Sequence, residues 1–126
     1  MNELVALHLK RAERFLVEAN FTLTNEFFDA AINRSYYAMF HAVTAVLKTE
    51  DVARSSHAGV IAAFNQFFVK PGKFTEVEGR WLKHGFETRN KNDYWPAPEN
   101  SEAEALQLFE EAKAFVAKCR EYCEGA

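Results

Sequence analysis

Cysteine, proline and glycine are all scarce in this 126-residue chain, which has two cysteines, three prolines and five glycines. Two cysteines do not make a disulfide framework and are typical of the reducing cytosol. Few prolines and glycines leave room for long helices. The net charge of only −3 argues against a protein that coats nucleic acid by bulk charge, although it allows a local basic patch. With 48% hydrophobic residues, general disorder is excluded.

The chain also lacks an apolar stretch long enough for a signal peptide or a membrane span. Its amino-terminal residues meet charge at Lys10 and Arg11, before such a stretch can form. The most apolar segment, residues 29–48, is interrupted by Arg34 and His41, whereas a spanning helix needs roughly 20 mostly apolar residues. We therefore expect a cytoplasmic protein with no membrane segment.

No segment alternates apolar and polar residues as a half-buried strand does, and no internal repeat is visible. Instead, residues 29–48 carry apolar side chains at helical steps over more than half of the helix circumference. These residues are Ile32, Tyr36, Tyr37, Met39, Phe40, Val43, Val46 and Leu47. A surface helix needs an apolar stripe only about 100° wide. This helix should therefore be contacted from several sides, as the centre of a bundle.

Four further segments each show one apolar face, and polar residues separate them. Possible amino-terminal caps precede four of the five expected helices. The candidates are Thr24 or Asn25, Ser55 or Ser56, Thr75 with Glu78, and Ser101 with Glu104. The first helix should end near Asn20 and the fourth near Tyr94. We expect an all-α fold over residues 1–126, with one domain built as an antiparallel four- to five-helix bundle.

The sequence shows no pattern of a metal site, a phosphate loop or a nucleophile elbow. Cys119 and Cys123 are one helical turn apart, but zinc needs three or four ligands, so small buried side chains are the better interpretation. The histidines are scattered over four helices, without the Glu-x-x-His pairs of a di-iron bundle. They are His8, His41, His57 and His84. We expect neither a metal nor another cofactor.

The segment Lys83–Trp95 differs from the rest, because apolar periodicity gives way to a dense polar set. Between Lys70 and Lys91, six lysines and arginines stand against three glutamates. Arg89 follows Phe86 by three residues and so continues the buried stripe. It either pairs with Asp93, one helical turn further on, or faces a cleft. Both interpretations stay open at this point.

Three segments, AAINRSYYAMFHAVTAVL, SSHAGVIAAFNQFFVK and FETRNKNDY, resemble the HEPN domain family in its small stand-alone prokaryotic branch. The resemblance implies an antiparallel helical bundle that dimerises, often encoded beside a minimal nucleotidyltransferase as toxin and antitoxin. Active members are metal-independent ribonucleases that use an arginine followed four to six residues later by a histidine. Arg89 matches that arginine, and Asn90 matches the polar residue after it.

The histidine of that motif is missing from this chain. Tyr94, Trp95 and Pro96 occupy its possible positions, and no histidine lies further downstream. Histidine suits proton transfer because its pKa lies near neutrality, whereas the pKa of tyrosine is roughly 10. We therefore expect weak or no RNA cleavage, with Arg89 and Tyr94 as the candidate catalytic residues.

Our main hypothesis is a homodimeric HEPN-type component of a toxin-antitoxin-like pair with a minimal nucleotidyltransferase. It would bind RNA or a nucleotide near the end of the fourth helix, with that helix at or beside the two-fold axis. The expected binding residues are Arg89, Asn90, Asp93, Tyr94, Lys83, His84 and Lys91. One alternative is a ribonuclease toxin that uses Arg89. Another is a non-catalytic dimeric scaffold or substrate-binding module, like the helical domain of aminoglycoside nucleotidyltransferases.

Overall fold

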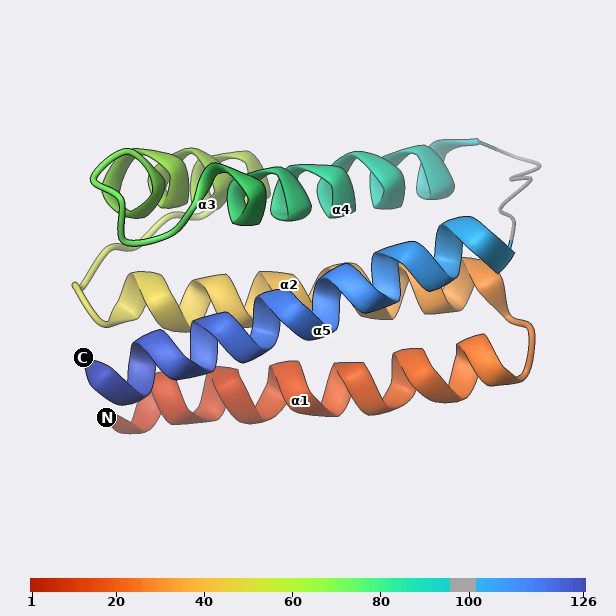
Figure 1. Ribbon diagram of the computed structural model, residues 1–126, viewed down its shortest axis with the longest axis horizontal. Coiled ribbons are helices and arrows are strands. Elements are labelled where there is room, and N and C mark those ends of the chain that lie inside the picture. Colours follow the sequence, from red (N-terminus) through yellow and green to blue (C-terminus); the bar gives the residue numbers. More distant parts are fainter. Residues whose placement is uncertain (96–101) are drawn as a thin grey trace.

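The computed structural model describes residues 1–95 and 102–126, and every regular element in them is helical (Figure 1). The elements are α1 (Glu3–Thr24), α2 (Phe28–Lys48), α3 (His57–Phe64), the π-helical turn η1 (Asn65–Val69), α4 (Glu76–Tyr94) and α5 (Glu102–Gly125). The expected all-α fold is thus confirmed. Within the described residues, no helix has the length and apolar character that crossing a bilayer requires.

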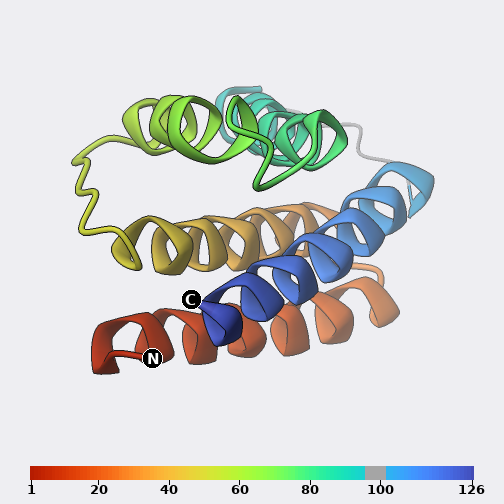
Figure 2. The same cartoon turned by 60° about the vertical axis from the view of Figure 1, so that its left-hand side comes forward.

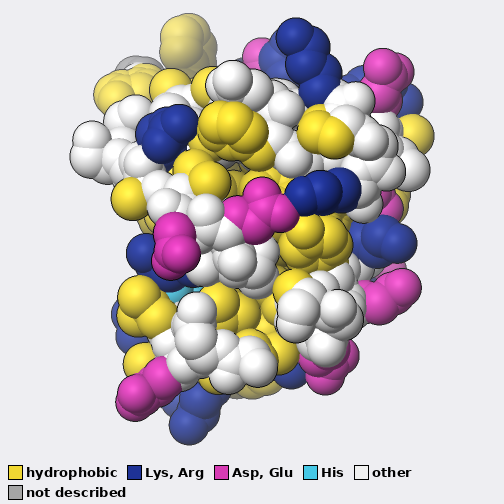
Figure 3. Space-filling model, turned by 90° about the vertical axis from the view of Figure 1, so that its left-hand side faces the viewer, with side chains coloured by type: hydrophobic (Ala, Val, Ile, Leu, Met, Phe, Trp, Pro, Cys, Tyr) yellow, Lys and Arg dark blue, Asp and Glu magenta, His cyan; other side chains and the backbone are white. Residues whose placement is uncertain are grey.

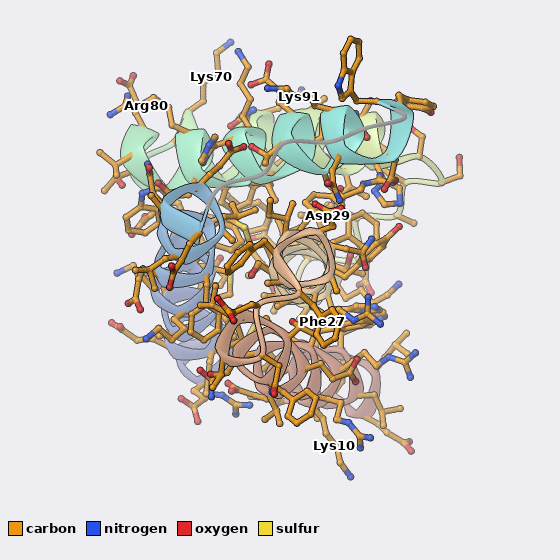
Figure 4. All side chains as sticks on the ribbon, turned by 90° about the vertical axis from the view of Figure 1, so that its right-hand side faces the viewer. Lys10, Phe27, Asp29, Lys70, Arg80 and Lys91 are labelled. Carbon is orange, nitrogen blue, oxygen red and sulfur yellow. The ribbon has the colours of Figure 1, made fainter. Side chains whose placement is uncertain are left out.

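Helix α2 is the centre of the bundle, as its broad apolar surface predicts. It packs against α1, α4 and α5. Helix α1 runs antiparallel to α2, and α4 runs antiparallel to α5 (Figure 1). Helix α5 crosses in front of α1 and α2 (Figure 2). In the view along the helices, α5 covers one side of α2, and the opposite side has no helix directly over it (Figure 4). Along α2, the side chains of Tyr37, Phe40 and His41 are only half-buried.

The helix ends confirm two of the expected caps and correct a third. The Ser56 hydroxyl accepts a hydrogen bond from the backbone N–H of Gly59 at 2.9 Å, and Thr75 and Glu78 form a complete capping box. Asn25 caps nothing in α2. Instead it ends α1, because the helix continues past Asn20 to Thr24. The turn to α2 then uses Glu26 at φ 64°, and α2 begins without a side-chain cap. Ser101 lies outside the described residues.

Helix α4 buries small side chains as well as part of the apolar stripe expected for it. Of that stripe, Leu82 is fully buried, Trp81 and Phe86 are half-buried, and Val77 is 43% exposed. The other buried positions are Gly79, Gly85 and Thr88. A Cβ atom at Gly85 would lie 3.0 Å from the sulfur of Met39. The glycine therefore lets the two helices approach closely, and this approach brings the end of α4 over α2.

Candidate functional site

Arg89 lies on α4 directly over two tyrosines of α2. Its guanidinium carbon is 5.1 Å from the ring centroid of Tyr36 and 5.5 Å from that of Tyr37. Its Nη1 donates a hydrogen bond to Oδ2 of Asp93 at 2.8 Å. The buried Nε has no hydrogen-bond partner among the described residues. Cation–π contacts and the ion pair thus fix the guanidinium, with its Nε turned inward and sealed from solvent.

A histidine from a third helix joins this cluster. His57 is the first residue of α3, and its Nδ1 lies 2.6 Å from the hydroxyl oxygen of Tyr36. Its ring stacks on that of Phe40 with centroids 4.2 Å apart and an angle of 13° between the planes. The Ser56 cap sets where α3 starts and therefore where His57 points. The cluster formed by Tyr36, Tyr37, His57 and Arg89 is called the tyrosine–arginine site below.

Burial and charge set the protonation of these groups. Burial raises the pKa of the Tyr36 phenol, an effect that the positive charge of Arg89 opposes, so the phenol keeps its proton. Burial, with a contribution from the charge of Arg89, lowers the pKa of His57. The site therefore holds a permanent cation beside a neutral imidazole and a neutral phenol at pH 7.

The structure brings together only part of the set of binding residues expected from the sequence. Arg89 and Asp93 pair, which confirms the contact between them, and Asn90 is half-buried nearby on α4. His84 instead contacts Glu111 of α5 at 2.7 Å. His84 and Tyr94 are each five residues from Arg89, so they point about 140° away from it around the helix.

The remaining expected residues also point outward. Tyr94 is 84% exposed, and its place on the helix gives it no contact with the ring cluster under Arg89. Lys83 is exposed, and Lys91 projects from α4 away from the bundle (Figure 4). The lysines thus contribute charge around the site without lying in it.

Sequence reasoning missed Tyr36, Tyr37 and His57 as members of this site. The tyrosines belong to the apolar stripe of α2, so they look like ordinary core residues. His57 precedes Arg89 by more than 30 residues, and only the return of α3 and α4 over α2 joins the two. One feature of the sequence pointed to His57: it directly follows the possible capping residue Ser56, so its position at the start of a helix could be predicted.

A second pair of histidines lies on α1 and α2. The Nδ1 atoms of His8 and His41 are 3.1 Å apart, and Phe15 stacks on His41 with centroids separated by 5.6 Å. Burial, aided by His8 and Arg11, lowers the pKa of His41 to about 4. Burial, aided by the charge of Lys48, also lowers the pKa of His8. The two neutral rings border an open hollow of about 560 Å³ lined by Leu4, Leu7, His8, Lys10, Arg11, Arg14 and His41.

No group of three or more histidine, cysteine, aspartate or glutamate side chains in residues 1–95 and 102–126 could hold a metal ion. Cys119 and Cys123 are buried on the inward face of α5, as expected for small apolar side chains. Burial raises the pKa of both thiols, that of Cys123 to about 11, which makes them unreactive at neutral pH. Among the described residues, neither a metal-ligand group nor the two cysteines therefore offers a reactive site, in contrast to the tyrosine–arginine site.

Comparison with known proteins agrees with this architecture. The family model of the HEPN domain matches residues 5–122, and the chain belongs to the HEPN domain family. A UPF0332 protein of Thermotoga maritima is 37% identical over 107 residues, which are 85% of this chain and 81% of the relative.

Two archaeal relatives carry a functional term in their names. "Putative toxin MJ0605" of Methanocaldococcus jannaschii is 36% identical over 105 residues, covering 83% of this chain and 78% of the relative. A second protein of that organism, "Putative toxin MJ0142", is 28% identical over 114 residues, covering 90% of this chain and 78% of the relative.

Proposed function

We propose that this protein is the toxin-like member of a two-protein pair and binds RNA phosphate at Arg89. Two relatives whose names contain the word toxin support the first part. A minimal nucleotidyltransferase is the partner that membership of the family suggests. Co-purification with the product of an adjacent nucleotidyltransferase gene tests that pairing, and separate elution of the two proteins contradicts it.

The observation that carries the proposal is the way Arg89 is held. The Arg89 side chain is 16% exposed, so it is anchored but not fully enclosed, while the Asp93 side chain is 40% exposed and can be displaced by a competing anion. Arginine presents a planar fork of donors that matches two phosphate oxygens, and here the terminal nitrogens of Arg89 would supply it.

The surroundings of Arg89 suit a nucleic acid better than a free anion. Tyr37, Phe40 and Phe86 are half-buried rings in and beside the tyrosine–arginine site. Aromatic side chains of this kind stack on unpaired bases, which contributes about 1–3 kcal/mol per base. Unpaired bases occur in single-stranded RNA, loops and ends, where stacking and phosphate contacts act together. We therefore infer single-stranded RNA as the ligand.

The test is a titration of the protein with a fluorescently labelled single-stranded RNA. Arg89→Ala should weaken binding about tenfold or more, because a lost charge-assisted hydrogen bond costs about 1.5–3 kcal/mol. It should also lower the salt slope by about one, as expected for one lost phosphate contact. Arg80→Ala, on an exposed position of the same helix, is the matched control. Equal binding by wild type and Arg89→Ala would leave only the scaffold interpretation.

A further inference from the structure

Besides the face that it buries in the bundle, α1 carries a second regular stripe of side chains on its outer face. This outer stripe consists of residues spaced alternately three and four apart, which are Leu4, Leu7, Arg11, Arg14, Glu18 and Phe21. Such spacing is typical of the seam along which two helices pack in a coiled coil. Its apolar members Leu4, Leu7 and Phe21 are 49%, 53% and 65% exposed. The outer stripe therefore has the pattern of a helix-packing surface, although its apolar side chains lie in solvent.

Two hollows follow the outer stripe from one end to the other. The first, of about 560 Å³, is the hollow bordered by His41 of α2. The second, of about 510 Å³, adjoins it, because Arg14 lines both, and Arg34 of α2 borders it. His41 and Arg34 are seven residues apart and so share one face of α2. From Leu4 to Phe21 the stripe is roughly 25 Å long, which is the length of a helix of about 17 residues.

The middle of the outer stripe is positively charged. Four cations line the two hollows, against the single carboxylate of Glu18. They are Lys10, Arg11, Arg14 and Arg34. Glu18 lies 3.4 Å from Nε of Arg14 and 3.7 Å from Nε of Arg34, so it offsets only one of these charges. The Arg14 side chain is 76% exposed, and Lys10 points away from the bundle (Figure 4). This surface is therefore complementary to an acidic partner.

We propose that the outer face of α1 binds an acidic amphipathic helix of another protein. Aspartates or glutamates in the middle of that helix pair with Arg11 and Arg14. Apolar side chains at its two ends pack on Leu4 and Leu7 and on Phe21. Helices commonly dock through apolar anchors three and four residues apart, and opposite charges then select the partner. The surface lies on a different helix from Arg89 and goes beyond the proposed binding of RNA.

The apolar residues of α1 distinguish this surface from a site for nucleic acid. Three of its four exposed large apolar side chains, those of Leu4, Leu7 and Val17, are aliphatic. Unpaired bases bind by stacking on aromatic rings, which these side chains do not have. Aliphatic side chains are instead stabilised by burial against other apolar groups. Cations between aliphatic side chains at coiled-coil spacing thus fit a helix better than an RNA strand.

The experiment lets the protein select its own helix. A phage-displayed library of helical peptides of about 17 residues, randomised along one face, is selected for binding to wild type. The selected peptides should carry aspartate or glutamate at the central positions of that face and apolar residues at both ends. The most frequent sequence is then synthesised with a fluorescent label, and anisotropy gives its dissociation constant.

Charge reversal on both molecules tests the pairing. The double variant Arg11→Glu/Arg14→Glu should bind the selected peptide about tenfold more weakly or worse, because like charges then face each other. A copy of the peptide with lysines at its central positions should bind this variant more tightly than it binds wild type. Damage to the fold would not produce that gain. Lys113→Glu/Lys118→Glu on α5 changes the net charge equally and should bind the selected peptide as wild type does.

A second pair of variants tests the apolar anchors. Leu7→Asn should weaken binding of the selected peptide about tenfold, since it removes an anchor from the contact. Leu106→Asn is the matched control, because Leu106 is similarly exposed, at 46%, but lies on α5. It should bind as wild type does. Equal binding by Leu7→Asn and wild type would contradict the assigned contact.

Three further outcomes overturn the inference. If no selected peptide loses affinity for Arg11→Glu/Arg14→Glu, or the selected peptides are not acidic, then the outer stripe does not bind an acidic helix. If the double variant alone changes its light-scattering mass, a second copy of this chain occupies the face. If the double variant loses affinity only for single-stranded RNA, the face binds nucleic acid. None of these measurements involves Arg89→Ala, so the RNA proposal stands or fails separately.

Discussion

Three of the four histidines of this protein lie against another aromatic ring. His8 and His41 stack on each other at 5.3 Å, and His57 stacks on Phe40 at 4.2 Å. Burial is the main reason why the pKa of each is lowered. A half-buried imidazole is stable in its neutral form, but burial penalises the charged imidazolium, so protonation of such a ring destabilises the folded protein.

The first prediction is a loss of stability in mild acid. The pKa of His41 is about 4 in the folded chain and about 6.5 when unfolded, so the unfolded chain binds its proton first as the pH falls. The contribution of this neutral ring to stability is complete above pH 6.5. It is lost progressively as the pH falls towards 4. Thermal unfolding of wild type at several pH values should show a falling midpoint in this window.

The variant His41→Phe keeps a ring stacked on Phe15 but has no proton to gain. Its unfolding midpoint should therefore fall less than that of wild type between pH 6.5 and 4. His84→Gln removes a histidine that pairs with Glu111 on the other side of α4, and it serves as the comparison. Parallel curves for wild type and His41→Phe would show that this ring does not carry the effect.

At the scale of the helices, the sequence predicts features that depend on neighbouring residues better than features that depend on contacts between helices. Ser56 and the Thr75–Glu78 capping box work within one turn, so sequence spacing is enough to find them. The expected end of α1 near Asn20 is wrong, because the helix continues to Thr24, where the side-chain amide of Asn25 donates a hydrogen bond to the carbonyl of Phe21 at 2.9 Å. The same residue pattern without that geometry looks like a connector.

In the candidate site too, a contact within one helix could be predicted from the sequence, whereas a contact between helices could not. Arg89 and Asp93 are one turn apart on one helix, so their pairing could be predicted from spacing. The contact of His57 with Tyr36 depends on how α3 folds back over α2, which no spacing encodes. His84 was expected near Arg89, but Glu111 on α5 holds it elsewhere. Partners on other helices therefore decide which expected residues reach the site.

The close approach of α4 to α2 at Gly85 gives a prediction at this scale. Gly85→Val would place a branched side chain where even a Cβ lies 3.0 Å from the Met39 sulfur and 3.4 Å from the Tyr36 ring. Overpacking of this kind should destabilise the fold by about 1–3 kcal/mol, as measured by chemical denaturation. It should also weaken RNA binding, because Arg89 would move off the tyrosines.

The control for Gly85→Val is Gly125→Val, since a Cβ at Gly125 has nothing within 4 Å. That change, at the last residue of α5, should leave the unfolding free energy nearly unchanged. If Gly85→Val is as stable as wild type and binds RNA equally, then the helices can separate without effect. The close approach would then not be what positions Arg89.

At the scale of the whole molecule, exposed apolar side chains are unevenly distributed. The end of the bundle that carries both termini shows side chains of both charge signs interspersed with apolar ones (Figure 3). Helix α1 exposes four large apolar side chains, and α4 with its carboxyl end exposes three. They are Leu4, Leu7, Val17 and Phe21 on α1, and Val77, Tyr94 and Trp95 at α4. Exposed apolar patches often mark contacts between proteins.

The last prediction is a symmetric homodimer with α4 at or beside the two-fold axis. Closed two-fold symmetry is the commonest arrangement of soluble homo-oligomers. Near the two-fold axis of such a dimer, an apolar residue lies close to its own copy in the partner subunit. A charged residue introduced there would bring two like charges together in the interface, which is strongly unfavourable. Val77→Glu, which changes a 43% exposed residue of α4, should therefore shift light-scattering mass from dimer to monomer.

Val17→Glu is the matched change on α1, where Val17 is 67% exposed. With the axis at α4, this variant should remain dimeric, because its charge stays in water. Dissociation by Val17→Glu alone would move the interface to α1. A monomer mass for wild type over a wide concentration range would refute the dimer altogether. The site would then have to work with one Arg89, whereas an axis beside α4 would bring two such arginines together and double the charge available to an RNA backbone.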